Sequence, residues 1–103
     1  MDSENNNCRY FISYSGIKLP LNLVNEIKDD ERENRNTYFR GFYDEHERLI
    51  RCEKLVYGEI ELLHCYNYHD SGVVRQAVIT DVDGEVTILV FNDQVELEKQ
   101  IEP

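Results

Sequence analysis

The fold is decided between residues 42 and 92, which read FYDEHERLIRCEKLVYGEIELLHCYNYHDSGVVRQAVITDVDGEVTILVFN. Turn signals recur along this stretch, each between segments rich in Tyr, Val, Ile and Leu: Asp44-Glu45-His46-Glu47, Gly58-Glu59, Asp70-Ser71-Gly72 and Asp83-Gly84. Tight turns between antiparallel strands give this spacing, and Asp-Gly or Gly-X at the turn is a strong signal for a hairpin. The stretch predicts a mainly β fold, an antiparallel meander of five to six strands that forms a curled sheet or partial barrel.

The turn at Gly58-Glu59 predicts how its two strands pair. If these two residues form the loop, side-chain alternation places one set of residues on a common face. The predicted pairs on that face are Tyr57 with Ile60, Leu55 with Leu62, Glu53 with His64, Arg51 with Tyr66, and Leu49 with Tyr68. On the other face, Cys52 is expected opposite Cys65.

The next two turns extend this face if each is a three-residue loop whose glycine, Gly72 or Gly84, takes the left-handed conformation. The first loop places Val74 beside Tyr68, Gln76 beside Tyr66, Val78 beside His64 and Thr80 beside Leu62. The second places Val86 opposite Thr80, Ile88 opposite Val78 and Val90 opposite Gln76. Three hairpins then agree on one core face.

Two more strands are expected upstream, at residues 9–14 and 37–43. If the turn after residue 43 follows the same rule, Glu47 takes the left-handed position at a cost of about 1–2 kcal/mol. Phe39 and Tyr43 then join the core face. Residues 17–25 are apolar but contain Pro20, so we expect an ordered loop with room for one helical turn. Its leucines are expected to cover a sheet face, for which a dimer contact is the alternative cover.

The predicted organisation is a frayed N-terminus over residues 1–8, one β-meander domain over residues 9–92, and a short acidic helix or tail over residues 93–103. The helix is expected because Asp93 and Glu96 form a start like a capping box. The chain of 103 residues is long enough to bury a core without a metal or disulfide. The polar start lacks the features of a signal peptide, and no apolar run approaches the ~20 residues of a membrane span. We expect a cytoplasmic protein without a membrane partner, a monomer or a homodimer, whose cysteines stay reduced.

The formal net charge is −10, with 21 acidic against 11 Lys and Arg residues. Such a charge repels nucleic-acid phosphate, so the expected partner is a basic protein surface, which includes that of a nucleic-acid-binding protein or complex. Solubility alone would also explain charged turns and tails. The candidate contact residues are the clustered acids Asp29, Asp30, Glu31, Asp44, Glu45, Glu47, Asp81, Asp83 and Glu85.

The chain contains no nucleophile elbow and no glycine-rich phosphate loop, so we expect neither an enzyme nor a cofactor. In the predicted register His64 faces away from Cys52 and Cys65, which argues against a zinc site. The favoured function is a non-enzymatic acidic binding module, an inhibitor or regulator. One form of such a module, suggested by analogy of charge, is a phosphate or DNA mimic of the kind that phages use against restriction or CRISPR complexes. The alternative is a small ligand-binding or catalytic domain with a pocket lined by Tyr57, His64, Tyr66, Tyr68, Glu53 and Arg51.

Two resemblances accompany these expectations. The segment Tyr43-Asp44-Glu45-His46-Glu47-Arg48-Leu49 resembles the Tyr-Asp-x-x-Gly-Arg-Leu units of YD or RHS-type repeats, from which it departs at Glu47, and residues 68–73 are a looser second copy. This resemblance implies hairpin architecture. The chain as a whole is similar to a family of small uncharacterised bacterial domains, through residues 9–11, 15–21 and 34–40. That similarity implies no activity.

Overall fold

The computed structural model describes residues 8–16, 19–94 and 96–101. Eight antiparallel strands form one sheet in the order β2-β1-β3-β4-β5-β6-β7-β8, which confirms the predicted mainly β meander. The chain order is broken only where β1 lies between β2 and β3. The strands are β1 (Cys8–Ser15), β2 (Asn22–Ile27), β3 (Thr37–Tyr43), β4 (Leu49–Val56), β5 (Glu59–Tyr68), β6 (Val74–Thr80), β7 (Val86–Phe91) and β8 (Leu97–Ile101), with a 3-10 helix, η2 (Asp29–Asn34), between β2 and β3.

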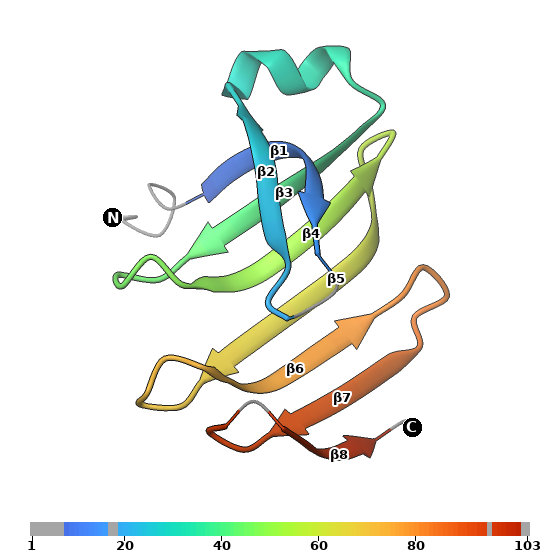
Figure 1. The fold of residues 1–103 in the computed structure, drawn as a ribbon. Coiled ribbons are helices and arrows are strands. Elements are labelled where there is room, and N and C mark those ends of the chain that lie inside the picture. Colours follow the sequence, from blue (N-terminus) through green and yellow to red (C-terminus); the bar gives the residue numbers. More distant parts are fainter. Residues whose placement is uncertain (1–7, 17–18, 95, 102–103) are drawn as a thin grey trace.

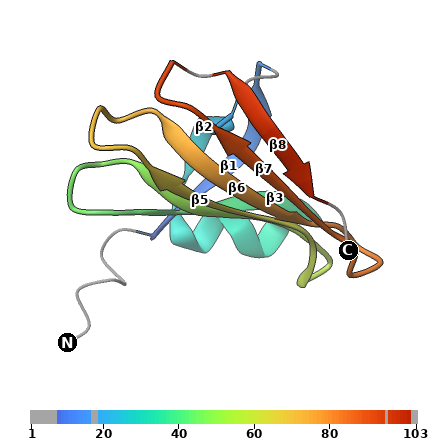
Figure 2. The ribbon, with the colours of Figure 1, turned by 90° about the horizontal axis from the view of Figure 1, so that it is seen from below.

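The sheet curls so strongly that the β1–β2 hairpin crosses in front of β3, β4 and β5 (Figure 1). The view along the sheet shows the same curl, and it places η2 against one side of the sheet (Figure 2). A glycine in β3 permits this crossing, because a Cβ atom at Gly41 would lie 2.7 Å from Cδ1 of Leu23 in β2. That distance is shorter than side chains tolerate, so a larger residue at position 41 would force the Leu23 side chain to move.

Three turns of the meander share one hydrogen-bonding pattern. In each turn an Asp or Asn side chain accepts backbone N–H bonds from the residues two and four positions later, as an Asx turn does. Asp44 accepts from His46 and Arg48, Asp81 accepts from Asp83 and Glu85, and Asn92 accepts from Gln94 and Glu96. In the first two turns the fourth residue is left-handed, with φ of 64° at Glu47 and 84° at Gly84, as predicted.

The predicted C-terminal helix is wrong. The hydrogen bonds of Asn92 with Gln94 and Glu96 form the third of these turns, and strand β8 begins at Leu97. Asn92 uses its side chain to hold the turn, and its N–H donates to the carbonyl of Glu96 at 2.9 Å. The Asn side chain one residue before the supposed cap thus determines the local structure.

The expectation of a loop over residues 17–25 is also wrong in its second half, because β2 begins at Asn22. Proline does not prevent this, since Pro20 precedes the strand and β2 lies at the edge of the sheet, where a missing N–H is tolerated. The leucines of this segment do cover a sheet face as expected: Leu19, Leu21 and Leu23 pack on the main core cluster. Residues 17 and 18 lie outside the described residues.

The predicted β4–β5 register is wrong. The loop residues are Tyr57 and Gly58, with φ of 51° and 83°, so both central positions are left-handed as in a type I′ turn. A further irregularity between Lys54 and Leu55 shifts the pairing again. The observed partners in the body of the hairpin are Cys52 with His64, Arg51 with Cys65, Glu53 with Leu63 and Lys54 with Leu62.

The later hairpins show where the turn rule holds. The β6–β7 pairs are as predicted: Thr80 with Val86, Val78 with Ile88 and Gln76 with Val90. In the β5–β6 hairpin, Tyr68 pairs with Val74 as predicted. Beyond a bulge between Asn67 and Tyr68 the prediction fails by one residue, because Gln76 pairs with Asn67, Val78 with Cys65 and Thr80 with Leu63.

Two hydrophobic clusters lie on opposite faces of the sheet. Neighbouring residues Tyr38 and Phe39 in β3 belong to different clusters because side chains alternate. The larger cluster contains Phe11, Phe39, Leu49, Cys52, Tyr66, Val74 and Ala77, and the smaller contains Ile27, Tyr38 and Leu55. Phe39 and Tyr43 therefore join the main core as expected.

Candidate functional site

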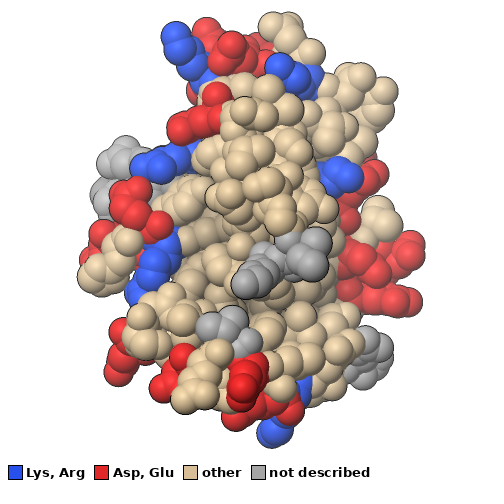
Figure 3. Space-filling model, in the orientation of Figure 1, with Lys and Arg blue, Asp and Glu red and all other residues tan. Residues whose placement is uncertain are grey.

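The predicted acidic residues lie at three separate borders of the molecule. Asp44, Glu45 and Glu47 form the β3–β4 turn, whereas Asp81, Asp83 and Glu85 form the β6–β7 turn at the opposite end of the strands (Figure 1). The third group, Asp29, Asp30 and Glu31, begins η2. On the face shown in Figure 3 the acidic side chains gather around the rim, and the middle is largely uncharged. The structure therefore does not bring the three groups onto one surface.

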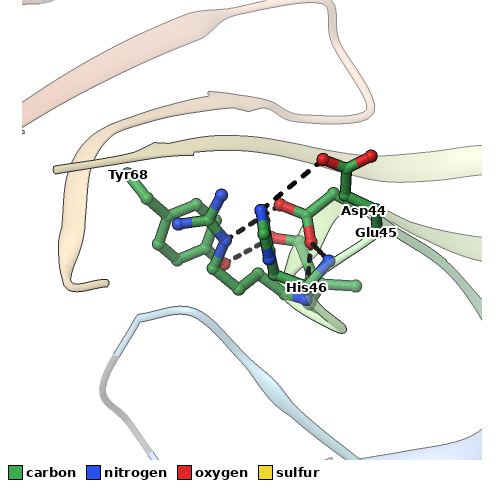
Figure 4. Close-up of polar contacts among 6 residues, drawn as sticks. Asp44, Glu45, His46 and Tyr68 are labelled. Atoms are coloured by element: carbon green, nitrogen blue, oxygen red, sulfur yellow. Dashed lines mark hydrogen bonds and ion pairs between the residues drawn. The ribbon is translucent and has the colours of Figure 1, made fainter. Parts of the chain in front are cut away.

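The acids of the β3–β4 turn are engaged within the protein. The Nε of Arg48 donates to Oδ2 of Asp44 at 2.9 Å, and Nη2 of Arg9 donates to Oε1 of Glu47 at 2.9 Å. Burial alone would raise the pKa of Asp44, but the N–H groups of Arg48 and His46 and the Arg48 guanidinium lower it below its usual value. Figure 4 shows this turn beside Tyr68, with its hydrogen bonds drawn as dashed lines. These carboxylates are partly used to hold the turn.

The β6–β7 turn has a different electrostatic character. Asp81 accepts N–H bonds from Asp83 at 2.9 Å and Glu85 at 3.0 Å, which holds the turn rigidly. Within residues 8–16, 19–94 and 96–101, none of the three carboxylates forms an ion pair. Val82, at the tip, is 65% exposed. The turn presents an apolar side chain between uncompensated negative charges.

The group at η2 is exposed and takes part in local structure. Oε1 of Glu31 accepts the N–H of Lys28 at 2.7 Å, and the N–H of Glu31 donates to the carbonyl of Lys28. These bonds close the start of the 3-10 helix. Glu31 therefore has a structural role beside its charge.

The predicted aromatic pocket is not formed as a unit. His64, Tyr66 and Tyr68 share the face of the main core, whereas Glu53 lies on the opposite face and pairs with Leu63. Arg51 lies on the face of Glu53, and Tyr57 stands at the tip of the β4–β5 turn, 77% exposed. The cause is the register described above, since a shift of one residue moves every side chain to the other face.

His64 and Tyr66 form a buried pair on the core face. Nδ1 of His64 lies 2.6 Å from the Tyr66 hydroxyl, which also accepts the N–H of Leu21 at 3.2 Å. Burial lowers the pKa of His64, so the neutral ring is favoured, and burial raises the pKa of Tyr66. The tautomer of His64 sets which of Nδ1 and the Tyr66 hydroxyl is the donor in this contact. The pair therefore anchors the segment before β2 to the centre of the sheet.

Glu53 is buried at 2% exposure between two arginines. Oε1 accepts from Nε of Arg40 at 2.6 Å, and Oε2 accepts from Nε of Arg51 at 2.7 Å. The sequence analysis placed Glu53 beside His64 and missed Arg40. Arg40 in β3 lies directly opposite Glu53 in β4, and only the correct β3–β4 register reveals this pair.

The cysteines do not assemble into a site. Cys52 lies opposite His64, whereas Cys65 lies opposite Arg51 on the other face, so the predicted Cys52–Cys65 pair is wrong. Cys52 and Cys65 are free thiols, and burial raises the pKa of Cys52 to about 12. Among the described residues, no group of three His, Cys, Asp or Glu side chains could hold a metal ion. No helix in the described part of the chain is long and apolar enough to cross a membrane.

A pocket that the sequence analysis missed lies between the segment before β2 and the turns that follow β3 and β5. Tyr68 is the only predicted pocket residue among those that line it, and it is joined there by Tyr43 and Arg48. The signal available in the sequence was the Tyr-Asp-x-x-x-Arg-Leu motif of residues 43–49, which supplies Tyr43, Glu47, Arg48 and Leu49 to the lining.

The fold and these contacts define a small antiparallel β protein with one curled sheet. The chain belongs to a family of unknown function, DUF6156, whose model matches residues 3–100. Comparison with curated proteins and with solved structures found no match. The family agrees with the similarity to small uncharacterised domains.

Proposed function

We propose that this protein is a non-enzymatic binding module, an inhibitor or regulator that engages a basic surface on a partner protein in the cytoplasm. One observation carries the proposal. Tyr57 and Val82, the two most exposed large apolar side chains of the described residues, stand at the tips of the β4–β5 and β6–β7 turns. No other turn lies between these two on that border of the sheet, because β4, β5, β6 and β7 are successive neighbours.

The charge around these tips favours a basic partner. Asp81, Asp83 and Glu85 surround Val82, and Glu59 follows the tip that carries Tyr57. Exposed tyrosines are frequent hot spots of interfaces, and uncompensated acids attract a partner of opposite charge. Asp44 and Glu47 at the β3–β4 turn are paired with arginines and are less suited to this role. We confine the proposal to this border and do not extend it to phosphate mimicry, because the three acidic groups do not form a row on one surface.

The test compares two charge-reversed variants in affinity captures from extracts of the source cells at low and high salt. Asp83→Lys combined with Glu85→Lys leaves Asp81 in place, so the turn keeps its hydrogen bonds. Asp70→Lys combined with Asp93→Lys makes the same change in charge at exposed turns on the opposite border.

Proteins retained by the wild type and by the control pair, but lost from the Asp83 and Glu85 pair and at high salt, would identify the partner. Tyr57→Ser and Val82→Ser should weaken the same captures. If both charge-reversed variants lose the same proteins, the partner responds only to the net charge of the protein, and the assignment of the interface to this border fails.

A further inference from the structure

The pocket beneath the segment before β2 has the size and lining of a ligand site. Its volume is about 420 Å³, within the ~300–1,000 Å³ of small-molecule sites. Apolar side chains from three different parts of the sheet form most of the wall, among them Leu21, Leu23, Leu49 and Val74. Leu21 and Leu23 pack on the main core only in part, so their apolar surface remains available to a ligand.

Two side chains at this pocket, Arg48 and Tyr43, can donate hydrogen bonds to a ligand. Arg48 lines the pocket, and its guanidinium is held 5.0 Å above the ring of Tyr68 by the contact of Nε with Asp44. Only Nε of Arg48 is engaged by the described side chains, which leaves its terminal amino groups to donate. Tyr43 is half-buried in the wall, and within the described residues its hydroxyl forms no hydrogen bond.

The one acidic side chain of the lining is already neutralised. Glu47 pairs with Arg9, whose guanidinium lies 5.1 Å above the ring of Tyr43. Both tyrosine rings therefore already carry an arginine, and these two cations disfavour a cationic ligand beside the rings. The negative charges of Asp44 and Glu47 offset the positive charges of Arg48 and Arg9. The electrostatic potential at the pocket is therefore not strongly positive or negative.

We propose that this pocket binds a small carboxylate with an apolar body, the body lying among the leucines and the carboxylate accepting from Arg48 and Tyr43. A guanidinium fixed by a second contact is preorganised for such a charge-assisted bond, which is the stronger kind of hydrogen bond. The turns after β3 and β5, which supply part of the lining, lie at the opposite border from the β6–β7 turn (Figure 1), so the test of this site is independent of the binding function proposed above.

The experiment titrates the ¹⁵N-labelled full chain with sodium octanoate, 1-octanol and octylammonium chloride, which share a tail and differ in the head group. Octanoate is expected to bind saturably and most tightly, with shifts at the amides of Leu21, Leu49 and Val74. Tyr43→Phe, which removes only the hydroxyl, should weaken octanoate about fivefold, and Arg48→Met about tenfold. Val73→Phe fills the mouth from a turn position and should abolish binding. Arg75→Met, an exposed arginine outside the pocket, is the matched control and should leave binding unchanged.

Several outcomes overturn the proposal. Equal binding of the three head groups would reduce the site to a general apolar surface. Equal losses of octanoate affinity in Arg48→Met and Arg75→Met would mean that binding depends only on the net charge of the protein. Unchanged binding in Val73→Phe would place the probe elsewhere, and the absence of saturable octanoate binding at about 1 mM would exclude a ligand of this class.

Discussion

Nδ1 of His64 and the hydroxyl oxygen of Tyr66 lie 2.6 Å apart on the buried face of β5. The same hydroxyl accepts the N–H of Leu21, so one tyrosine connects the centre of the sheet to the segment that leads into β2. Tyr66→Phe leaves both partners without their hydrogen bond and should lower the free energy of unfolding by about 1–3 kcal/mol. Urea denaturation measures this loss. Tyr57→Phe, at an exposed tip, should have no effect, and equal losses in the two variants would contradict the prediction.

The buried imidazole should make stability depend on pH. Burial lowers the pKa of His64 below 6.5, so the unfolded chain binds its proton at a higher pH than the folded chain. The stabilisation from neutral His64 is complete above the unfolded pKa and is lost as pH falls from there towards the folded pKa. Urea denaturation at several pH values between 7.5 and 5 should show this slope. His64→Gln should reduce the slope, whereas His46→Gln, at an exposed turn, should not.

Glu47 occupies a left-handed position, with φ of 64°, in a turn where its counterpart is Gly84. Glu47→Gly removes the steric cost and should raise the free energy of unfolding by about 1 kcal/mol. Its ion pair with Arg9 is exposed and contributes little to stability. Thermal unfolding is the measurement, with Glu45→Gly in the same turn as the control. A Glu47→Gly variant that is no more stable than the wild type would show that the turn does not strain the backbone.

The buried carboxylate of Glu53 should stabilise the fold through its contacts with two arginines. Glu53→Gln keeps the volume but removes the charge from a carboxylate that is 2% exposed, so Arg40 and Arg51 are left facing a neutral amide. We expect a loss of about 2 kcal/mol in chemical denaturation. Glu98→Gln, on the exposed strand β8, should stay within about 0.5 kcal/mol of the wild type. A similar loss in both variants would mean that total charge, rather than this contact, stabilises the fold.

Cys52 and Cys65 should never form a disulfide in the folded protein. Their side chains leave opposite faces of the sheet, so the sulfur atoms cannot approach without unfolding. Cys52 is also buried, with its pKa raised to about 12, and should react with iodoacetamide only when urea unfolds the chain. Peptide mapping by mass spectrometry after oxidation or alkylation tests both points. Rapid alkylation of native Cys52, or a Cys52–Cys65 disulfide, would show that the β4–β5 register is not the one described.

Much of the fold was predictable because its turns are local. The loop of residues 82–84 places Gly84 in the left-handed position, and the β6–β7 hairpin carries no bulge, so the register read from this turn holds along both strands. The strained turn at Glu47 was predictable for the same reason. Asn92 shows the limit of such prediction. It holds a turn like those at Asp44 and Asp81, but with an asparagine in place of the aspartate, and the sequence predicts a helix start at the next residue instead.

The candidate sites depended on interactions that no short segment contains. The bulge near Lys54 shifts the β4–β5 pairing by one residue, and it carries Glu53 away from His64 and Cys65 away from Cys52. The bulge near Asn67 shifts the β5–β6 pairing in the same way. Whether a strand bulges depends on how its side chains pack against the facing strand and the β1–β2 hairpin. The sequence of residues 49–56 alone does not determine that packing.

The amino-acid sequence by itself determined the fold class, the positions of the turns and the excess of acid, because turn chemistry and composition act within a few residues. Only the tertiary structure decided that Tyr43, Arg48 and Tyr68 line a pocket with Leu21, and that the acidic groups stand at separate borders. The physical reason is the curl of the sheet. It brings the segment before β2 over strands far from it in the chain. Successive turns lie at opposite ends of the strands for a separate reason, because neighbouring strands run antiparallel.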